Sequence, residues 1–104
     1  MLWAQDSLEV SQDSLQRLNY EAIYDRVKRA RSNTTQQSFY LKAYLDKARM
    51  ENDYREMVQG YKNYLHRSEG VTRLAYADSM VLTAKTAGDI SLIGSAYLTK
   101  GIVF

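Results

Sequence analysis

Two stretches of the sequence, ARMENDYREMVQGY at residues 48–61 and AKTAGDISLIGSAY at residues 84–97, follow the same pattern 36 residues apart. Each holds a residue that readily adopts the left-handed backbone conformation, then an aspartate, and later a tyrosine. The first of these can end a helix, and the aspartate can cap the next helix. The sequence therefore predicts that one helix–turn–helix hinge occurs twice. The matching pairs are Ala48 with Ala84, Asn52 with Gly88, Asp53 with Asp89, and Tyr61 with Tyr97; weaker pairs are Tyr40 with Tyr76, Gly60 with Ala96, Leu45 with Val81, and Met57 with Ile93.

Apolar residues at steps of three and four continue on both sides of these hinges, and no segment alternates with the period of a strand. The chain has 104 residues, 45% of them apolar, and no proline. We therefore predict an all-α fold with helices at about 14–31, 36–51, 54–68, 72–87 and 90–104. Residues 1–13 are interpreted as an N-terminal arm, either disordered or the remnant of a signal segment, and residues 14–104 as one helical domain truncated at its C-terminus.

Polar residues and glycines mark the predicted helix ends. Thr34 with Gln37, and Asp53 with Glu56, have the spacing of a capping box, in which each side chain binds a free amide of the first turn. Gly70 separates the third and fourth helices.

A helix pair that repeats after 36 residues is close in length to the tetratricopeptide unit, whose repeat is about 34 residues. The chain resembles that family in its small and aromatic positions: Tyr61, Tyr97, Gly101 and Phe104 in the first helix of each pair, and Ala77, Val81 and Ala84 in the second. Leu65 and Ser68 depart from the pattern. The resemblance implies a tetratricopeptide-like α-solenoid, a right-handed stack of antiparallel helical hairpins that serves in protein binding.

Three phrases carry a narrower resemblance: residues 43–48, 76–79 and 96–101. They are similar to the N-terminal repeat regions of certain Bacteroidetes transcriptional regulators that end in a DNA-binding helix-turn-helix domain. This resemblance implies the sensory or oligomerising repeat segment of a larger bacterial regulatory protein. We accordingly expect a protein or peptide partner and no direct nucleic-acid binding by this segment.

The family's concave groove would be lined by the first helix of each pair. Lys62 and His66 are four residues apart, so their donors could meet a carboxylate or an acidic peptide, although solvated polar residues at this spacing are ordinary. The resemblance assigns to the groove Arg26, Gln59, Lys62, Asn63, His66, Ser95, Leu98 and Ile102.

Apolar residues continue to the last position of the chain, where repeat arrays usually present a polar face. We expect Leu98, Ile102 and Phe104 to be covered by a further helix, by a second copy of the chain, or by exchange of the last helix. The alternative function is therefore a stand-alone helical dimerisation domain with no groove ligand, a homodimer through the C-terminal helix.

Basic residues are concentrated in Arg26-Val27-Lys28-Arg29-Ala30-Arg31. Such a run can contact phosphates, but cations also complement a helix C-terminus, and we favour the helix end. The nine tyrosines could stack on bases, but pairs such as Tyr20 with Tyr24 and Tyr40 with Tyr44 have the spacing of helix packing.

The sequence carries no signature of catalysis. It has one histidine, no cysteine, no phosphate-binding glycine loop and no zinc motif. We therefore expect no enzymatic activity, no cofactor and no metal site. No apolar run approaches the about 20 residues of a membrane-spanning helix, so we expect no membrane insertion. Compartment stays open between the bacterial cytoplasm and periplasm.

Overall fold

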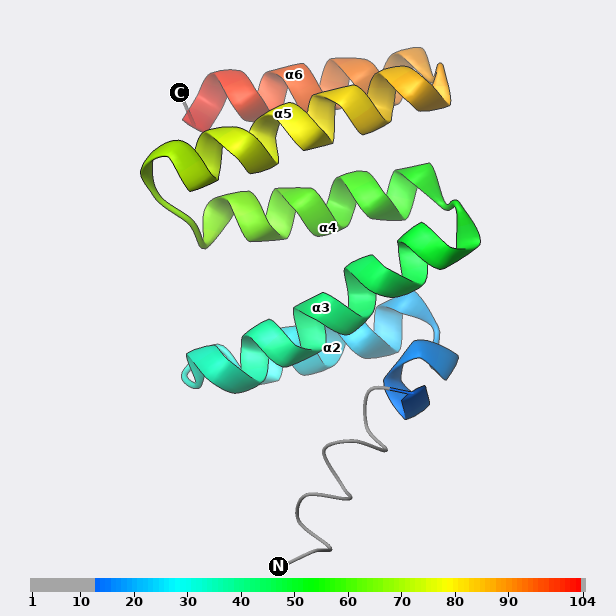
Figure 1. The fold of residues 1–104 in the computed structure, drawn as a ribbon, viewed down its shortest axis with the longest axis vertical. Coiled ribbons are helices and arrows are strands. Elements are labelled where there is room, and N and C mark those ends of the chain that lie inside the picture. The colour runs from blue at the N-terminus through cyan, green and yellow to red at the C-terminus, as the bar shows by residue number, and fades with distance from the viewer. Residues whose placement is uncertain (1–12, 104) are drawn as a thin grey trace, which may run out of the picture. The chain divides into compact units, whose positions relative to one another are not determined.

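The computed structural model describes residues 13–103, in which every regular element is a helix (Figure 1). The prediction of an all-α fold is therefore confirmed. A short helical segment at residues 13–17 comes first. The helices after it are α2 (Tyr20–Arg29), α3 (Thr34–Glu51), α4 (Tyr54–His66), α5 (Gly70–Ala87) and α6 (Ile90–Val103).

These helices form two compact units, divided between Lys47 and Ala48 within α3. The first unit contains α2 and most of α3, and the second contains α4, α5 and α6. Each unit is described by itself below, and the stacking of both into one solenoid stays a prediction.

In the first unit, α2 and α3 form a hairpin held by a buried polar contact and an aromatic cluster (Figure 1). The amide Nε2 of Gln37, a residue only 8% exposed, donates a 2.9 Å hydrogen bond to the carbonyl oxygen of Val27. Tyr20 and Tyr24 each pack edge-to-face with Tyr44, at ring-centroid distances of 5.2 and 6.2 Å. These tyrosines pack helix against helix, as their spacing predicts.

The helix predicted at 14–31 is wrong as a single element, because the chain breaks at Leu18 and Asn19. Asn19 has an extended backbone, and its side chain accepts a 2.8 Å hydrogen bond from the backbone N–H of Ala22. Asparagine is among the strongest N-cap residues, so it starts a new helix here in spite of continuous apolar spacing. The prediction that the basic run forms a helix end is confirmed, since the last turn of α2 contains Arg26, Lys28 and Arg29.

The start of α3 also differs from the predicted capping box. Asn33, one residue before Thr34, caps the helix, and its Oδ1 accepts a 3.0 Å hydrogen bond from the N–H of Gln36. Gln37 cannot reach back to a cap because its side chain is buried against α2. Tertiary packing here overrides a local signal.

The predicted repeat of the hinge is confirmed in the backbone. Asn52 has φ of 55°, and Gly88 has φ of 71°, so both adopt the left-handed conformation. The N–H of Asn52 donates to the carbonyl of Arg49 at 3.2 Å, and the N–H of Gly88 donates to the carbonyl of Lys85 at 3.0 Å. α3 and α5 thus end with the same left-handed residue position and one matching hydrogen bond, and the first hinge adds a bond of 2.9 Å from the N–H of Asp53 to the carbonyl of Ala48.

The helices that follow the two hinges start with the same cap. The Oδ1 of Asp53 accepts a 3.2 Å hydrogen bond from the N–H of Glu56, and that of Asp89 accepts one of 3.0 Å from the N–H of Leu92. Each aspartate satisfies one of the free amides at a helix start.

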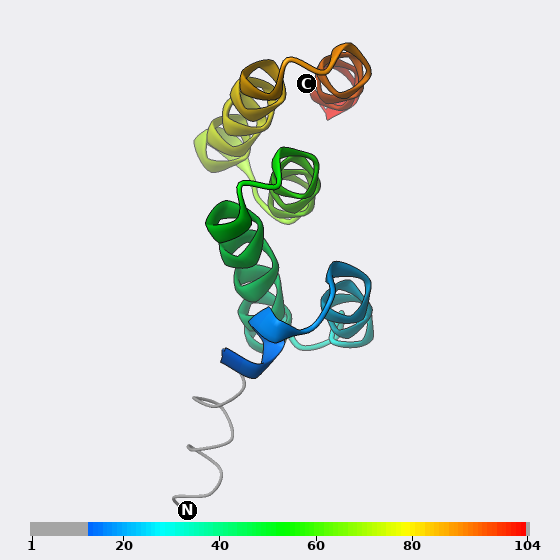
Figure 2. The same ribbon diagram turned by 90° about the vertical axis from the view of Figure 1, so that its right-hand side faces the viewer.

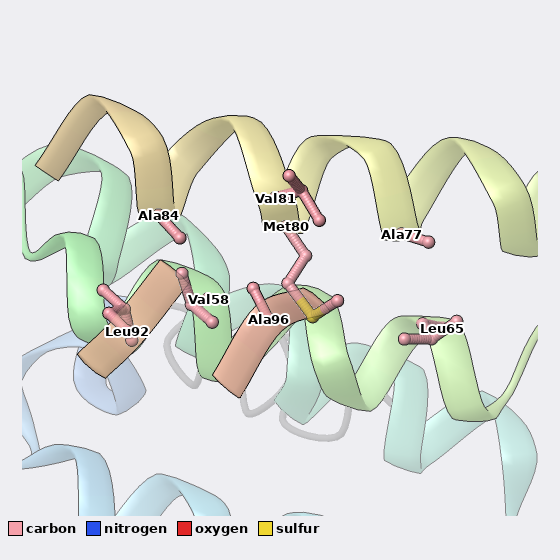
Figure 3. Packing of buried hydrophobic residues seen from close by; sticks show 8 residues of the cluster. All are labelled: Val58, Leu65, Ala77, Met80, Val81, Ala84, Leu92 and Ala96. Carbon is pink, nitrogen blue, oxygen red and sulfur yellow. The ribbon is translucent and has the colours of Figure 1, made fainter. Parts of the chain in front are cut away.

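In the second unit, α4 and α5 run antiparallel, and α6 lies beside α5 on the same side as α4 (Figures 1 and 2). Leu65, which stands where the tetratricopeptide family has a small residue, is 0% exposed. It lies near Ala77, which is also buried, so a small residue on α5 accommodates the larger one on α4 (Figure 3). The core of this unit consists of Val58, Leu65, Ala77, Met80, Val81, Ala84, Leu92 and Ala96.

None of the helices described is long and apolar enough to cross a membrane.

Candidate functional site

Two of the predicted groove residues meet between α4 and α6. Nζ of Lys62 lies 3.4 Å from Oγ of Ser95, which makes a long hydrogen bond between the two helices. Gln59, three residues before Lys62 on α4, is half-buried, and His66 is exposed at the end of that helix. A polar strip formed by Gln59, Lys62 and His66 therefore follows one side of α4, with Ser95 beside it.

Asn63 does not belong to that strip, because its side chain is only 6% exposed. Its Nδ2 donates a 2.9 Å hydrogen bond to the carbonyl of Gln59, and its Oδ1 accepts one of 3.1 Å from Arg67. Both ends of the amide are thus engaged inside the protein. The prediction that Asn63 faces a groove ligand is wrong, because the amide is buried and serves α4 itself.

Arg26 belongs to the first unit, where it is exposed on α2. The polar strip can therefore be described only from residues of α4 and α6.

Each of the two repeated tyrosines lies beside a basic side chain, a contact that the sequence analysis does not predict. The guanidinium carbon of Arg49 lies 5.5 Å from the ring centroid of Tyr61, and Nζ of Lys85 lies 5.4 Å from that of Tyr97. Arg49 and Lys85 are themselves 36 residues apart. The sequence pattern that indicates these contacts is a basic residue directly after each repeated alanine, Ala48 and Ala84.

The solvent-facing side of α6 carries no charged residue. Ile90 is 86% exposed, Leu98 66% and Tyr97 46%. Charged residues make up 25% of the chain, but none stands among the exposed positions described on α6. This open α6 face consists of Ile90, Ser91, Gly94, Ser95, Tyr97, Leu98 and Gly101.

The internal repeat shows what covers the corresponding face of α4. Val58 and Leu65 are 2% and 0% exposed, because α5 packs on them (Figure 3). Tyr61 between them lies against Tyr76 of α5, with ring centroids 6.5 Å apart. The residues 36 positions later on α6 are Gly94, Tyr97 and Gly101, and all three are exposed. No described helix packs on α6 as α5 packs on α4.

Of the residues predicted for self-association, Leu98 lies on the open α6 face. Ile102 belongs to α6, but its side chain lies outside the described residues, as does Phe104.

Two further leucines are exposed on α5, Leu74 at 42% and Leu82 at 66%. Between them, Asp78 pairs with Lys100 of α6 at 2.9 Å. The residues 36 positions before the two leucines are Ser38 and Asp46, both polar. The two repeats therefore differ in sequence at these positions, which are polar in the first and apolar in the second.

In residues 13–103, no group of three acidic, histidine or cysteine side chains is placed to hold a metal ion. Comparison with models of protein families, with curated proteins and with solved structures found no match.

Proposed function

We propose that this chain is a protein–protein interaction module, in which the open α6 face binds an α-helix of a protein partner. One observation carries the proposal. Gly94, Tyr97 and Gly101 are exposed on α6, whereas their counterparts on α4 are covered by a helix. The partner helix would occupy on α6 the place that α5 occupies on α4.

The residue types of this face suit helix docking. Tyr97 and Leu98 offer apolar area, whose burial contributes about 25 cal/mol per Å². Gly94 has no heavy atom within 4 Å of where a Cβ would stand, and the same is true of Gly101. A neighbouring backbone can therefore approach closely at both positions. The face itself has no charged residue, and the charged groups beside it are Lys85, whose Nζ lies 5.4 Å from the ring centroid of Tyr97, and Lys62, which hydrogen-bonds Ser95.

Binding of a partner helix fits the role that the sequence resemblance suggests for this chain. That role is the sensory or oligomerising repeat segment of a larger bacterial regulatory protein. In that setting the interaction would join this segment to another part of the regulator or to a separate protein. The sequence resemblance and the open α6 face support this proposal.

The alternative is a stand-alone dimerisation domain, in which the partner is a second copy of the chain. The same observation favours it, since a two-fold arrangement brings the same face of each copy together and would cover Tyr97 in both. The two functions share a surface and differ only in the occupant.

Photo-crosslinking in the cells that make the protein tests the proposal. A benzoylphenylalanine at position 98 should form adducts, and the same residue at position 50 is the control, because Met50 is 74% exposed on α3. Adducts with another protein support the module, and adducts of twice the chain mass support the dimer. No adduct at position 98 above that at position 50 would contradict both.

The polar strip is a second candidate for partner contact, favoured by the approach of Lys62 to Ser95. If it binds an acidic peptide, the double variant Lys62→Ala, His66→Ala should weaken partner capture and leave the oligomeric state unchanged. Tyr97→Glu should have this effect instead if the open α6 face carries the binding. Comparing the two variants separates the two surfaces.

A further inference from the structure

The first unit holds a hollow of about 190 Å³ between the end of α2 and the beginning of α3. α2 contributes Arg26 and Arg29, with Ala30 just beyond its last residue, and α3 contributes Gln36 and Tyr40. A water molecule occupies about 30 Å³ in the liquid, so the hollow has room for a small ion and several waters.

The charge of this hollow is positive. Two of the lining side chains are guanidinium groups, and none is a carboxylate. Arg29 forms an ion pair with Asp25, which lies one helical turn earlier on α2. A guanidinium has five N–H donors, and one carboxylate can accept at most part of them, so Arg29 keeps donors for a ligand. Within residues 13–103, Arg26 has no ion-pair partner.

The α3 side of the hollow adds neutral donors. Nε2 of Gln36 donates a 3.2 Å hydrogen bond to the phenolic oxygen of Tyr40. Because that oxygen accepts here, the O–H of Tyr40 is available to donate elsewhere. The second N–H of the Gln36 amide is available in the same way. Donors from two helices therefore surround a space with a net positive charge.

We propose that Arg26, Arg29, Gln36 and Tyr40 form a binding site for a single phosphate group, free or as a monoester. Guanidinium groups bind phosphate oxygens through paired, charge-assisted hydrogen bonds, which suits them better than lysine for such a ligand. The site lies in the first unit and does not depend on the proposed function of α6.

A nucleic acid is a poorer fit than a single phosphate, although the basic run suggested one. Nucleic-acid binding needs cations arranged along a strand of phosphates. Nζ of Lys28 lies 5.3 Å from the ring centroid of Tyr24, and both residues line a different hollow. The cations of the run are therefore divided between separate surfaces, and only two of them reach the hollow.

Titration of the full chain with inorganic phosphate, followed by nitrogen-15 NMR, tests the site. The signals of Gln36, Tyr40 and the two arginine side chains should shift and saturate together. Arg26→Gln removes one charge and should weaken the affinity roughly tenfold, as expected for loss of charge-assisted hydrogen bonds. Lys28→Gln removes one charge from the same helix outside the hollow and should change the affinity less than about twofold. Tyr40→Phe should weaken binding severalfold without altering the fold.

A parallel titration with O-phosphoserine distinguishes a site for a phosphate monoester from a site for the free phosphate ion. Tighter binding than that of inorganic phosphate assigns the site to a monoester, and equal binding assigns it to the free ion. The proposal is overturned if phosphate shifts none of the four residues, or if Lys28→Gln weakens binding as much as Arg26→Gln. It is also overturned if single-stranded DNA binds more tightly than phosphate with equal losses in both variants.

Discussion

The guanidinium of Arg49 lies over the ring of Tyr61, and its Nη2 donates a 2.8 Å hydrogen bond to the phenolic oxygen. The same arrangement of cation and ring recurs between Lys85 and Tyr97, 36 residues later. The two halves of the repeat thus share a contact as well as a sequence pattern. The difference is in what surrounds the tyrosine, since Tyr61 also lies against α5, whereas Tyr97 is exposed.

Arg49→Ala should destabilise the protein more than Lys85→Ala. A cation over an exposed ring contributes about 0.5–1 kcal/mol, and both variants lose this contact. Arg49→Ala also loses the hydrogen bond to Tyr61, which adds about 1 kcal/mol. Urea denaturation of both variants measures the difference. Tyr61→Phe is the control that removes only the hydrogen bond, and equal midpoints for Arg49→Ala and Lys85→Ala would refute the assignment.

Gly88→Ala should lower the free energy of unfolding by about 1 kcal/mol, because an L-residue in the left-handed conformation is strained. No heavy atom lies within 4 Å of the position of its new Cβ, so the backbone alone determines the cost.

Gly94→Ala is the matched control for the same added methyl group. Gly94 lies inside α6, where alanine is the better helix former, so stability should rise by about 0.5–1 kcal/mol. If the open α6 face binds a helix closely, this variant should bind its partner less well although it is more stable. A loss of stability in Gly94→Ala would contradict the placement of this residue on an open face.

The repeated hinge could be predicted from the sequence because its signals are local. Asn52 and Gly88 are suited to one backbone conformation, and Asp53 and Asp89 bind amides only three residues away. Such features depend on neighbours along the chain, so an offset in the sequence is enough to find them.

Two of the differences from the sequence prediction occur where residues distant in the chain or tertiary packing decide the structure. Gln37 is placed by Val27, ten residues earlier, and Asn63 is buried by the way α4 packs. The break at Asn19 has a local cause, a cap that interrupts continuous apolar spacing, so periodicity alone does not predict it. The open α6 face could be identified only after the structure showed which residues of α4 are covered by α5.

Asp53→Ala and Asp89→Ala should each cost about 1 kcal/mol, the usual effect of losing an N-cap. Asp89 also pairs with Arg55 of α4 at 3.2 Å, but their side chains are 41% and 67% exposed, so this ion pair should add only a few tenths of a kcal/mol. Thermal denaturation with Arg55→Ala as the control separates the two contributions. Replacement of Asp89 by Asn should retain most of the cap, and a full loss in that variant would show that the charge matters more than the cap.

Leu65→Ala should be the most damaging of these substitutions, with a loss of about 2–5 kcal/mol. Leu65 is 0% exposed and lies in the same cluster as Ala77 and Met80. Ala77 is too small to fill the cavity that the substitution creates, and Met80 of the same cluster can fill it only in part, so most of the cost should remain. Leu82→Ala is the control, since Leu82 is 66% exposed and its truncation should change stability by less than about 0.5 kcal/mol. Equal effects of the two variants in urea denaturation would mean that α4 and α5 do not pack through Leu65, and the covered face of α4 would then lose its value as a template for α6.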